Sequence, residues 1–308
     1  MHSLTLELTN SCPQYCTYCS SDAQPTGNGK LQLAMTAAMR LVDEAEDLCT
    51  RKIILSGGEP RLYPYFWSIA DEIARRQIRP FVYTCGVYPQ QMFNRYSAQV
   101  KFGLGCLPDE EAERFKDKGV TVVFNINSAD AELHDFYTNT PGSYYIMMQS
   151  LLKCLQYKVS VQLNYVPLRT DGFEKIIALA KSLGIPQINV LRLVKQGRAK
   201  TYLDVPVTTE RQLVQLALQK ANRTLVRLGA PYNPLVSSAM YRECAVRKLD
   251  KIVVTPDGWI LPCEAFKYRK TDFYNIHNQT LKDALESPLF RELQQEAQDG
   301  CPVHKIVK

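Results

Sequence analysis

Hydrophobic and polar positions follow two different periods along the first two-thirds of the chain. At residues 4–9 leucine alternates with polar residues, and this period of two predicts a strand. A helical period follows at 33–48, and short apolar runs then alternate with further helical patterns. The remaining predicted strands are 52–56, 80–84, 120–126, 159–166 and 187–194, and the remaining predicted helices are 65–76, 109–118, 142–157, 172–183 and 208–228.

Six strand–helix units in succession predict a parallel sheet with right-handed crossovers, which is an α/β fold. Because six units are too few for the closed eight-unit barrel, we expect an open, partial (β/α)6 barrel. The functional loops of such sheets gather at the carboxyl ends of the strands. Residues 87–106 fit the repeat poorly and are expected to form an insertion.

The pattern changes after a cluster of turn residues at 229–234. Residues 251–261 then predict a β-hairpin that turns at Asp257. Residues 280–298 predict a helix that starts with a capping box at Thr280. We therefore expect three parts, which are the partial barrel at 1–205, a helical linker at 206–235 and a small α+β domain at 236–308.

Composition narrows the class of protein. A hydrophobic fraction of 45% with 22% charged residues is typical of a soluble globular chain. No apolar run approaches the length that spans a bilayer, and the sequence begins directly in an alternating segment with no signal peptide. These features predict no membrane contact and a cytoplasmic location. Ten cysteines without an export signal then indicate metal ligation rather than disulfides.

Three of these cysteines, Cys12, Cys16 and Cys19, form a C-x3-C-x2-C pattern just after the first predicted strand. Three thiolates on one tight loop can hold three irons of a [4Fe–4S] cluster, which leaves the fourth iron open to a small molecule. A structural zinc site is the alternative, but it requires four ligands and no local fourth ligand follows this pattern.

This spacing, with the aromatic Tyr18 before the third cysteine, resembles the signature of radical S-adenosylmethionine (SAM) enzymes. The resemblance implies that the open iron chelates the methionine part of SAM and that Tyr18 lies near the adenine. It also implies that an electron from the cluster cleaves SAM to a 5′-deoxyadenosyl radical, which abstracts hydrogen from the substrate. An electron donor such as a flavodoxin or ferredoxin would supply that electron.

A second motif follows the second predicted strand. It resembles the GGEP motif, which contacts the amino group of SAM in that family, and consists of Gly57, Gly58, Glu59 and Pro60. Glycines let the backbone come close to a ligand, and a carboxylate can accept a hydrogen bond from a cationic amine. Cys85 stands where relatives often carry asparagine, so we expect it either in the substrate cavity as a candidate catalytic residue or buried as a structural thiol.

Polar side chains follow the later predicted strands. Asn125 and Asn127 lie in a stretch that resembles the ribose-binding stretch of the family, with Asn127 in place of the usual acid. Asn164 and Arg192 could reach SAM from the next two strand ends, because arginine can grip a carboxylate with two hydrogen bonds. The segment 197–199 (Gly-Arg-Ala) matches a small motif that often follows the sixth strand.

The C-terminal hairpin resembles the start of SPASM and Twitch domains, which are auxiliary iron–sulfur extensions of radical SAM enzymes. Cys244, Gly258 and Cys263 follow a C-x13-G-x4-C pattern, and Cys301 stands where a further ligand is expected. The full seven-cysteine set is absent, so at most one auxiliary [4Fe–4S] cluster fits, with three thiolates. His304 is a candidate fourth ligand. Otherwise the fourth iron is open to substrate, and the alternative for this domain is a Cys3His zinc site.

The resemblance covers nearly the whole chain and is closest to peptide maturases at residues 120–160 and at the final helix. It therefore implies a substrate that is a ribosomally synthesised precursor peptide, modified by cross-linking, epimerisation or backbone excision. The net charge of +6 suits an acidic leader peptide. Because the chain has no room for a recognition domain, we expect a separate recognition protein that adds the leader as an extra strand.

Two other functions stay open on the sequence. One is a radical SAM enzyme that acts on a small carbohydrate or nucleotide-like metabolite. The other is a non-catalytic metal-binding module that binds RNA. The chain has only two tryptophans and lacks a basic–aromatic repeat, which argues against binding of nucleic acid.

Overall fold

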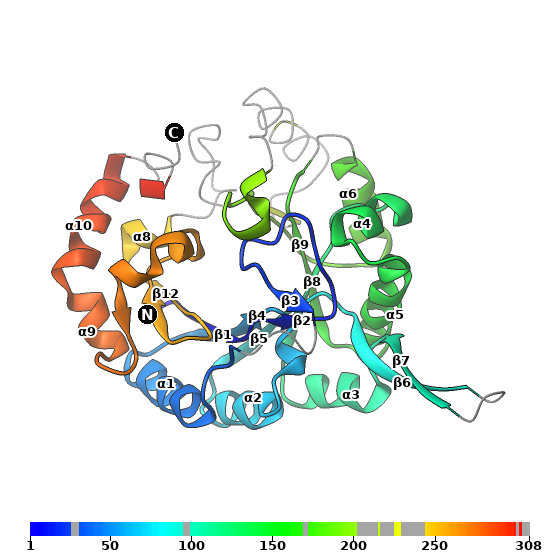
Figure 1. Cartoon of the computed structure of the whole chain (residues 1–308), viewed down its shortest axis with the longest axis horizontal. Helices are drawn as coiled ribbons and strands as arrows, with labels where there is room; N and C mark the ends of the chain where they lie inside the picture. The colour runs from blue at the N-terminus through cyan, green and yellow to red at the C-terminus, as the bar shows by residue number, and fades with distance from the viewer. Residues whose placement is uncertain are drawn as a thin grey trace.

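The computed structural model describes residues 1–25, 31–94, 99–168, 172–201, 215, 225–228, 244–299 and 302–303. Its main element is a curved sheet with an outer arc of helices (Figure 1). The expected Cys301 and His304, most of the expected linker at 206–235 and the turn cluster at 229–234 lie outside the described residues.

Seven parallel strands form the barrel part of the sheet. In sheet order they are β11 (Val226–Leu228), β10 (Ile188–Val190), β9 (Ser160–Tyr165), β8 (Thr121–Asn125), β5 (Arg79–Thr84), β4 (Lys52–Gly57) and β1 (Ser3–Thr9). Each strand lies beside the next along the chain, as repeated right-handed strand–helix units require. The α/β fold with an open parallel barrel is therefore confirmed. β11 occupies the end of the helix expected at 208–228, so that part of the prediction was wrong.

Helices cover the outer face of the sheet (Figure 1). They are α1 (Met35–Asp47), α2 (Phe66–Arg75), α3 (Asp109–Asp117), α4 (Ala131–Thr138), α5 (Ser143–Gln156) and α6 (Phe173–Ser182). The 3₁₀ turn η1 (Pro60–Leu62) follows β4, and the 3₁₀ turn η2 (Gly197–Thr201) lies against the segment that carries the first three cysteines (Figure 1). The alternation at residues 4–9 sets this packing. Leu4, Leu6 and Leu8 pack in the main core with α1 and α2, whereas Thr5 and Glu7 lie buried on the other face.

The C-terminal part continues the same sheet beyond β1. β12 (Lys251–Val254) pairs in parallel with β1, and β13 (Trp259–Leu261) and β14 (Tyr274–Asn275) follow in antiparallel order. Ile252, Val253 and Val254 are buried within the main hydrophobic core. The predicted hairpin is therefore present, and it is joined to the barrel through a shared sheet.

Short helices complete the C-terminal part. They are α8 (Ala245–Lys248), η4 (Glu264–Asp272), α9 (Leu281–Glu286), α10 (Pro288–Glu296) and η5 (Ala297–Asp299). The predicted capping box is present, since Thr280 and Asp283 exchange side-chain to backbone hydrogen bonds at the start of α9. The single helix expected at 280–298 is divided, because Ser287 caps α10 and Pro288 cannot continue the helix before it.

Residues 88–105 depart from the strand–helix repeat, as expected. β6 (Tyr88–Asn94) and β7 (Gln99–Gly105) pair in antiparallel order and project from the side of the barrel (Figure 1). A smaller pair, β2 (Ser11–Cys12) and β3 (Gln24–Pro25), closes the loop that carries the first three cysteines. Within the described part of the chain, no helix has both the length and the apolar character needed to cross a bilayer.

Candidate active site

The cysteine loop runs from β2 to β3 at the carboxyl end of β1. Cys12 is buried, and Cys16 and Cys19 are half-buried. Burial and the neighbouring Cys12 and Cys19 raise the pKa of Cys16 well above its usual value, so the three sulfurs interact electrostatically. The backbone N–H of Ala23 also points at the Cys19 sulfur, at 3.4 Å.

No three Cys, His, Asp or Glu side chains among the described residues are arranged to hold a single metal ion. The loop thiols nevertheless fit a cluster, because a cluster distributes its protein ligands over several iron atoms. Cationic iron would also favour the thiolate forms, which otherwise repel one another at Cys12, Cys16 and Cys19. The donor set therefore suits an iron–sulfur cluster better than a mononuclear site.

Arg198 holds the backbone of this loop. Its Nε donates to the Cys16 carbonyl at 2.8 Å, and its Nη1 donates to the Ala23 carbonyl at 2.7 Å and to the Asp22 carboxylate at 3.0 Å. The guanidinium also lies over the Tyr15 ring, 3.9 Å from the centroid. One planar cation therefore joins both ends of the cysteine loop.

Two further contacts hold the same loop from neighbouring elements. The Arg198 backbone N–H donates to the Cys19 carbonyl at 3.0 Å, and a Cβ on the preceding Gly197 would lie only 2.6 Å from that oxygen. Glycine is therefore required at position 197. From the other side, the Tyr137 carbonyl at the end of α4 accepts from the Thr17 backbone at 2.9 Å and from its hydroxyl at 3.2 Å.

The two glycines of the second motif lie directly against the start of the cysteine loop. A Cβ on Gly57 would lie 2.3 Å from the Thr9 carbonyl, and one on Gly58 would lie 2.1 Å from the Ser11 carbonyl. The Gly58 and Glu59 amides donate to those carbonyls at 2.6 and 2.7 Å. The sequence interpretation assigned the glycines to close approach of a ligand. In the structure they allow the close approach of the chain's own backbone at Thr9 and Ser11.

Glu59 is fully buried, and its carboxylate accepts from donors of the chain itself. They are the Thr84 hydroxyl at 2.8 Å, the Cys85 backbone N–H at 2.9 Å and the Arg61 backbone N–H at 3.3 Å. Burial raises the pKa of Glu59, although these hydrogen bonds act in the opposite direction. Pro60 then begins η1, where a missing N–H is tolerated. The motif therefore ties the end of β4 to the end of β5.

Cys85 lies next to Cys12, the first cysteine of the loop. Its pKa is raised by burial and by a hydrogen bond with Cys12, and its sulfur also donates to the Val87 carbonyl at 3.4 Å. The adjacent Thr84 hydroxyl exchanges a hydrogen bond with the Tyr88 hydroxyl at 2.9 Å. Cys85 thus belongs to a buried polar group beside the cysteine loop.

Tyr18 and the polar residues after β8 lie together. Tyr18 is buried and accepts a short hydrogen bond from the Asn125 side-chain amide. Asn127 is 5% exposed, and its side-chain amide makes no well-aligned hydrogen bond with a described residue, although it lies close enough to the Tyr18 hydroxyl to oppose the rise that burial causes in the pKa of that group. Buried amides are normally paired, so this one is suited to a polar ligand. Its backbone N–H donates to the ring of His134 at 3.4 Å, which is a local role.

A row of asparagines crosses three neighbouring strands. Asn125 is in register with Asn164, and Asn164 is in register with Asn189, whose amide donates to the Asn164 side-chain oxygen at 3.1 Å. Arg192 follows two residues after β10 and is half-buried. The structure therefore brings Asn125 and Asn164 together, and adds Asn189, which the sequence interpretation did not include.

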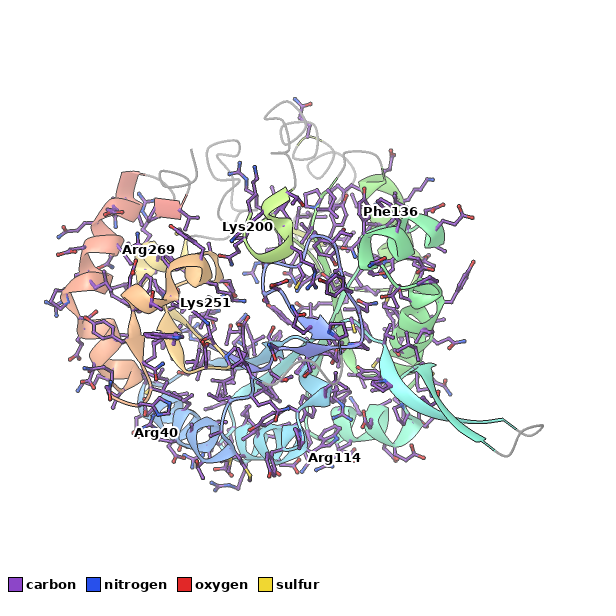
Figure 2. The ribbon with its side chains drawn as sticks, viewed as in Figure 1. Arg40, Arg114, Phe136, Lys200, Lys251 and Arg269 are labelled. Atoms are coloured by element: carbon purple, nitrogen blue, oxygen red, sulfur yellow. The ribbon has the colours of Figure 1, made fainter. Side chains whose placement is uncertain are left out.

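The second group of cysteines lies at the C-terminal hairpin. Cys263 follows β13 and Cys244 precedes α8, and both are half-buried. Burial, the neighbouring Glu264 and, more weakly, Cys244 raise the pKa of Cys263 to about 12. Burial alone would raise the pKa of Glu264, but Lys251 lowers it to about 2. Lys251 lies on the inner side of the sheet, whereas Arg40 and Arg114 belong to the outer helical layer (Figure 2).

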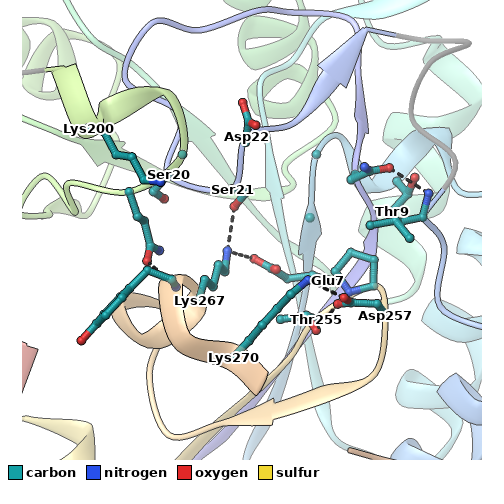
Figure 3. Close-up of a pocket in the computed structure, with 18 residues that line it drawn as sticks. Glu7, Thr9, Ser20, Ser21, Asp22, Lys200, Thr255, Asp257, Lys267 and Lys270 are labelled. Atoms are coloured by element: carbon teal, nitrogen blue, oxygen red, sulfur yellow. Dashed lines mark hydrogen bonds and ion pairs between the residues drawn. The ribbon is translucent and has the colours of Figure 1, made fainter. Parts of the chain in front are cut away.

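A cavity of about 260 Å³ lies between the barrel, with its cysteine loop, and the C-terminal hairpin and η4. Residues of the cysteine loop, the glycine motif, η2, the hairpin turn and η4 line it together (Figure 3). Lys267 of η4 connects the C-terminal part to the barrel, because its ammonium pairs with the buried Glu7 of β1 and donates to the Ser21 hydroxyl at 2.7 Å. Many of the lining residues carry polar side chains, but most of the surface that they present to the cavity is apolar.

An open parallel barrel with three cysteines at its first strand end and a Gly-Gly-Glu-Pro loop at its second defines an iron–sulfur enzyme of the SAM-cleaving class. Residues 6–183 match the radical SAM superfamily, and the chain belongs to it. Residues 244–303 match SPASM, an iron–sulfur cluster-binding domain. The protein is therefore a radical SAM enzyme with a C-terminal iron–sulfur domain, and the alternative of a non-catalytic RNA-binding module is wrong.

Comparison with known proteins gives the following relatives. The chain is 24% identical to the PqqA peptide cyclase of Methylocella silvestris in an alignment 321 positions long, which covers 98% of this chain and 80% of that protein. It is 24% identical to the AdoMet-dependent heme synthase of Methanosarcina barkeri over 259 residues, with coverage of 82% and 68%. Streptococcus suis SuiB, solved with the precursor peptide SuiA, shares the fold with a TM-score of 0.74 and 15% identity, over 99% of this chain and 73% of SuiB.

Proposed function

We propose that this enzyme modifies a ribosomally synthesised precursor peptide. The observation that carries the proposal is the similarity to PqqA peptide cyclase along 98% of the chain. The fold shared with SuiB, whose structure holds a precursor peptide, agrees with it. Cross-linking, epimerisation and backbone excision are the reactions that this class of substrate allows.

The chain's own residues supply the binding site. Cys12, Cys16 and Cys19 hold the N-terminal cluster, and Arg198 keeps their loop in place. When bound, the cluster and SAM supply a 5′-deoxyadenosyl radical that abstracts hydrogen from the substrate. The proposed SAM contacts are Tyr18, Gly57, Gly58, Glu59, Pro60, Asn125, Asn127, Asn164 and Arg192.

The buried Asn127 amide is the best supported of these contacts, because it makes no well-aligned hydrogen bond with a described residue and is almost inaccessible to water. The amides of Asn125 and Asn164 are already used in part, by Tyr18 and Asn189. Glu59 is held by three donors of the chain. We therefore assign Glu59 to positioning of the loop as well as to SAM, and Asn127 to direct recognition.

The C-terminal domain holds one auxiliary cluster in this proposal. Cys244, Cys263 and Cys301 are its thiolate ligands, and His304 is the candidate fourth ligand. A flavodoxin or ferredoxin supplies electrons in the reducing cytoplasm, where thiolate clusters survive. A separate recognition protein presents the leader peptide by adding it as a strand.

The test is anaerobic turnover of each short peptide that the neighbouring open reading frames encode, with SAM and a reductant. We expect 5′-deoxyadenosine and a change in peptide mass, both absent in Cys16→Ala. If 5′-deoxyadenosine forms but neighbouring peptides keep their mass in the presence of their recognition protein, the peptide proposal is wrong.

A small-molecule substrate is the second candidate, and the similarity to AdoMet-dependent heme synthase over 82% of the chain favours it. This function predicts turnover of a carbohydrate, nucleotide or other metabolite without any peptide. Anaerobic incubation with a metabolite extract, followed by mass spectrometry, distinguishes the two candidates. Consumption of one metabolite in proportion to 5′-deoxyadenosine would select it.

A further inference from the structure

Gln196 is a buried glutamine, 2% exposed, on the segment between β10 and η2. Both ends of its side-chain amide are used, and both contacts go to the segment after Cys263. Its Nε2 donates to the Glu264 carbonyl at 2.8 Å, and its Oε1 accepts from the Tyr268 backbone N–H at 3.2 Å. A buried amide with hydrogen bonds at both its oxygen and its nitrogen is held in one orientation. A displacement of Glu264 or Tyr268 would therefore move Gln196 as well.

The two residues after Gln196 contact the other group of cysteines. Gly197 packs so closely that a Cβ there would lie 2.6 Å from the Cys19 carbonyl, and the Arg198 N–H donates to the same oxygen at 3.0 Å. The Arg198 side chain then holds the Cys16 carbonyl. Three consecutive residues therefore connect the position next to Cys263 with two ligands of the N-terminal loop.

A second side chain, independent of Gln196, also connects the C-terminal part to the barrel. Lys267, three residues after Glu264, pairs with Glu7 of β1 and donates to the Ser21 hydroxyl, two residues after Cys19 (Figure 3). The two charged side chains are only 11% and 6% exposed, so solvent screens the pair weakly. The segment that begins at Cys263 is thus joined to the cysteine loop at Ser21 and to β1 at Glu7.

We propose that Gln196 is a positioning residue that couples the two cluster sites. When Cys263 is held by its cluster, η4 fixes the Gln196 amide, and residues 196–198 fix the Cys16 and Cys19 end of the N-terminal loop. Loss of the C-terminal cluster then loosens the N-terminal loop, and iron leaves the N-terminal cluster faster. This inference rests on the ligand role proposed for Cys263.

The test is a double-mutant cycle on the full-length, reconstituted enzyme. Gln196→Met keeps an unbranched side chain of similar size and removes both amide hydrogen bonds. Gln294→Met is the matched control, because the Gln294 amide also donates to a backbone carbonyl, that of Arg247, at 3.0 Å within the C-terminal domain. The first-order release of iron from the N-terminal cluster to a chelator is followed by its electron paramagnetic resonance signal.

We expect Gln196→Met to speed this release about tenfold, because two buried hydrogen bonds are lost. Cys263→Ala should act similarly, and the double variant should release iron no faster than either single variant. Gln294→Met should behave as wild type. Release from Gln196→Met at the wild-type rate, or effects of the two changes that multiply, would overturn the coupling.

Two measurements distinguish a failure of the coupling through Gln196 from a failure of the ligand role proposed for Cys263. An unchanged iron content in Cys263→Ala contradicts the ligand role of Cys263, whereas wild-type release from an otherwise normal Gln196→Met contradicts the coupling alone. If Gln196→Met does not fold, hydrogen exchange of residues 15–23 decides instead. Exchange there should be faster in Cys263→Ala than in wild type, and equal exchange would overturn the coupling.

Discussion

Replacement of Arg198 by methionine removes the side-chain donors that close the cysteine loop. The change leaves the backbone N–H to Cys19 in place, so it isolates the guanidinium. Three hydrogen bonds, to Cys16, Ala23 and Asp22, are lost together with the contact over Tyr15. The expected result is a loop that holds its iron weakly while the barrel itself stays folded.

The size of the effect follows from these contacts. Hydrogen bonds to a charged group contribute about 1.5–3 kcal/mol each, and a cation–π contact about 0.5–1 kcal/mol. The Arg198 side chain is 13% exposed and its contacts share one loop, so the contributions are not additive. We expect about 3 kcal/mol in all, which is on the order of a hundredfold faster release of iron from the N-terminal cluster.

The assay is iron release to a chelator after anaerobic reconstitution, with thermal unfolding measured in parallel. Arg198→Lys should lie between wild type and Arg198→Met, because lysine keeps the charge but not the planar fork. Arg247→Met is the control, since Arg247 also donates two side-chain hydrogen bonds, both to Gln298 in the C-terminal part of the chain. A full cluster with wild-type resistance to chelation in Arg198→Met would refute the reasoning.

Three further predictions concern other parts of the site. Cys16→Ala should lower the iron content from about eight to about four per chain and abolish 5′-deoxyadenosine, and continued SAM cleavage would contradict the ligand set. Gly58→Ala should lower the unfolding free energy by about 2–3 kcal/mol, because its Cβ would lie 2.1 Å from the Ser11 carbonyl. Gly119→Ala is the control, since its Cβ meets nothing within 4 Å, and it should lower the unfolding free energy by about 1 kcal/mol because of its positive φ. Similar losses for the two variants in chemical denaturation would contradict the close packing at Gly58. Burial lowers the pKa of His134 from 6.5 to about 4, so the unfolded chain takes up its proton first as pH falls. From pH 7 to pH 5 the wild type should lose about 2 kcal/mol more unfolding free energy than His134→Gln, and parallel stability curves for the two proteins would be the contrary result.

Much of the barrel follows from its local patterns. The strands at 52–57, 79–84 and 160–165 and the helices α2, α3 and α5 begin and end within a few residues of their predicted positions, whereas α4 was not predicted. Local chemistry also predicted the capping box at Thr280. These features depend on neighbours in sequence, and hydrophobic periodicity reports such neighbours directly.

The parts that were missed depend on pairing between distant segments. Nothing near residues 251–254 indicates that they pair with residues 3–6, and nothing near Gln196 indicates Glu264 as its partner. Arg198 was recognised only as part of a short motif, because the carbonyls that it binds belong to a distant segment of the chain. Ser287 before Pro288 is an overlooked local signal, because serine at the cap and proline at the first position start a new helix.

The parallel pairing of β1 with β12 has a consequence for biosynthesis. During synthesis, β1 keeps one hydrogen-bonding edge open until Lys251–Val254 have been made. An open edge of this kind invites pairing with other nascent chains. Shortened chains that stop before β12 should therefore aggregate rather than yield an isolated barrel.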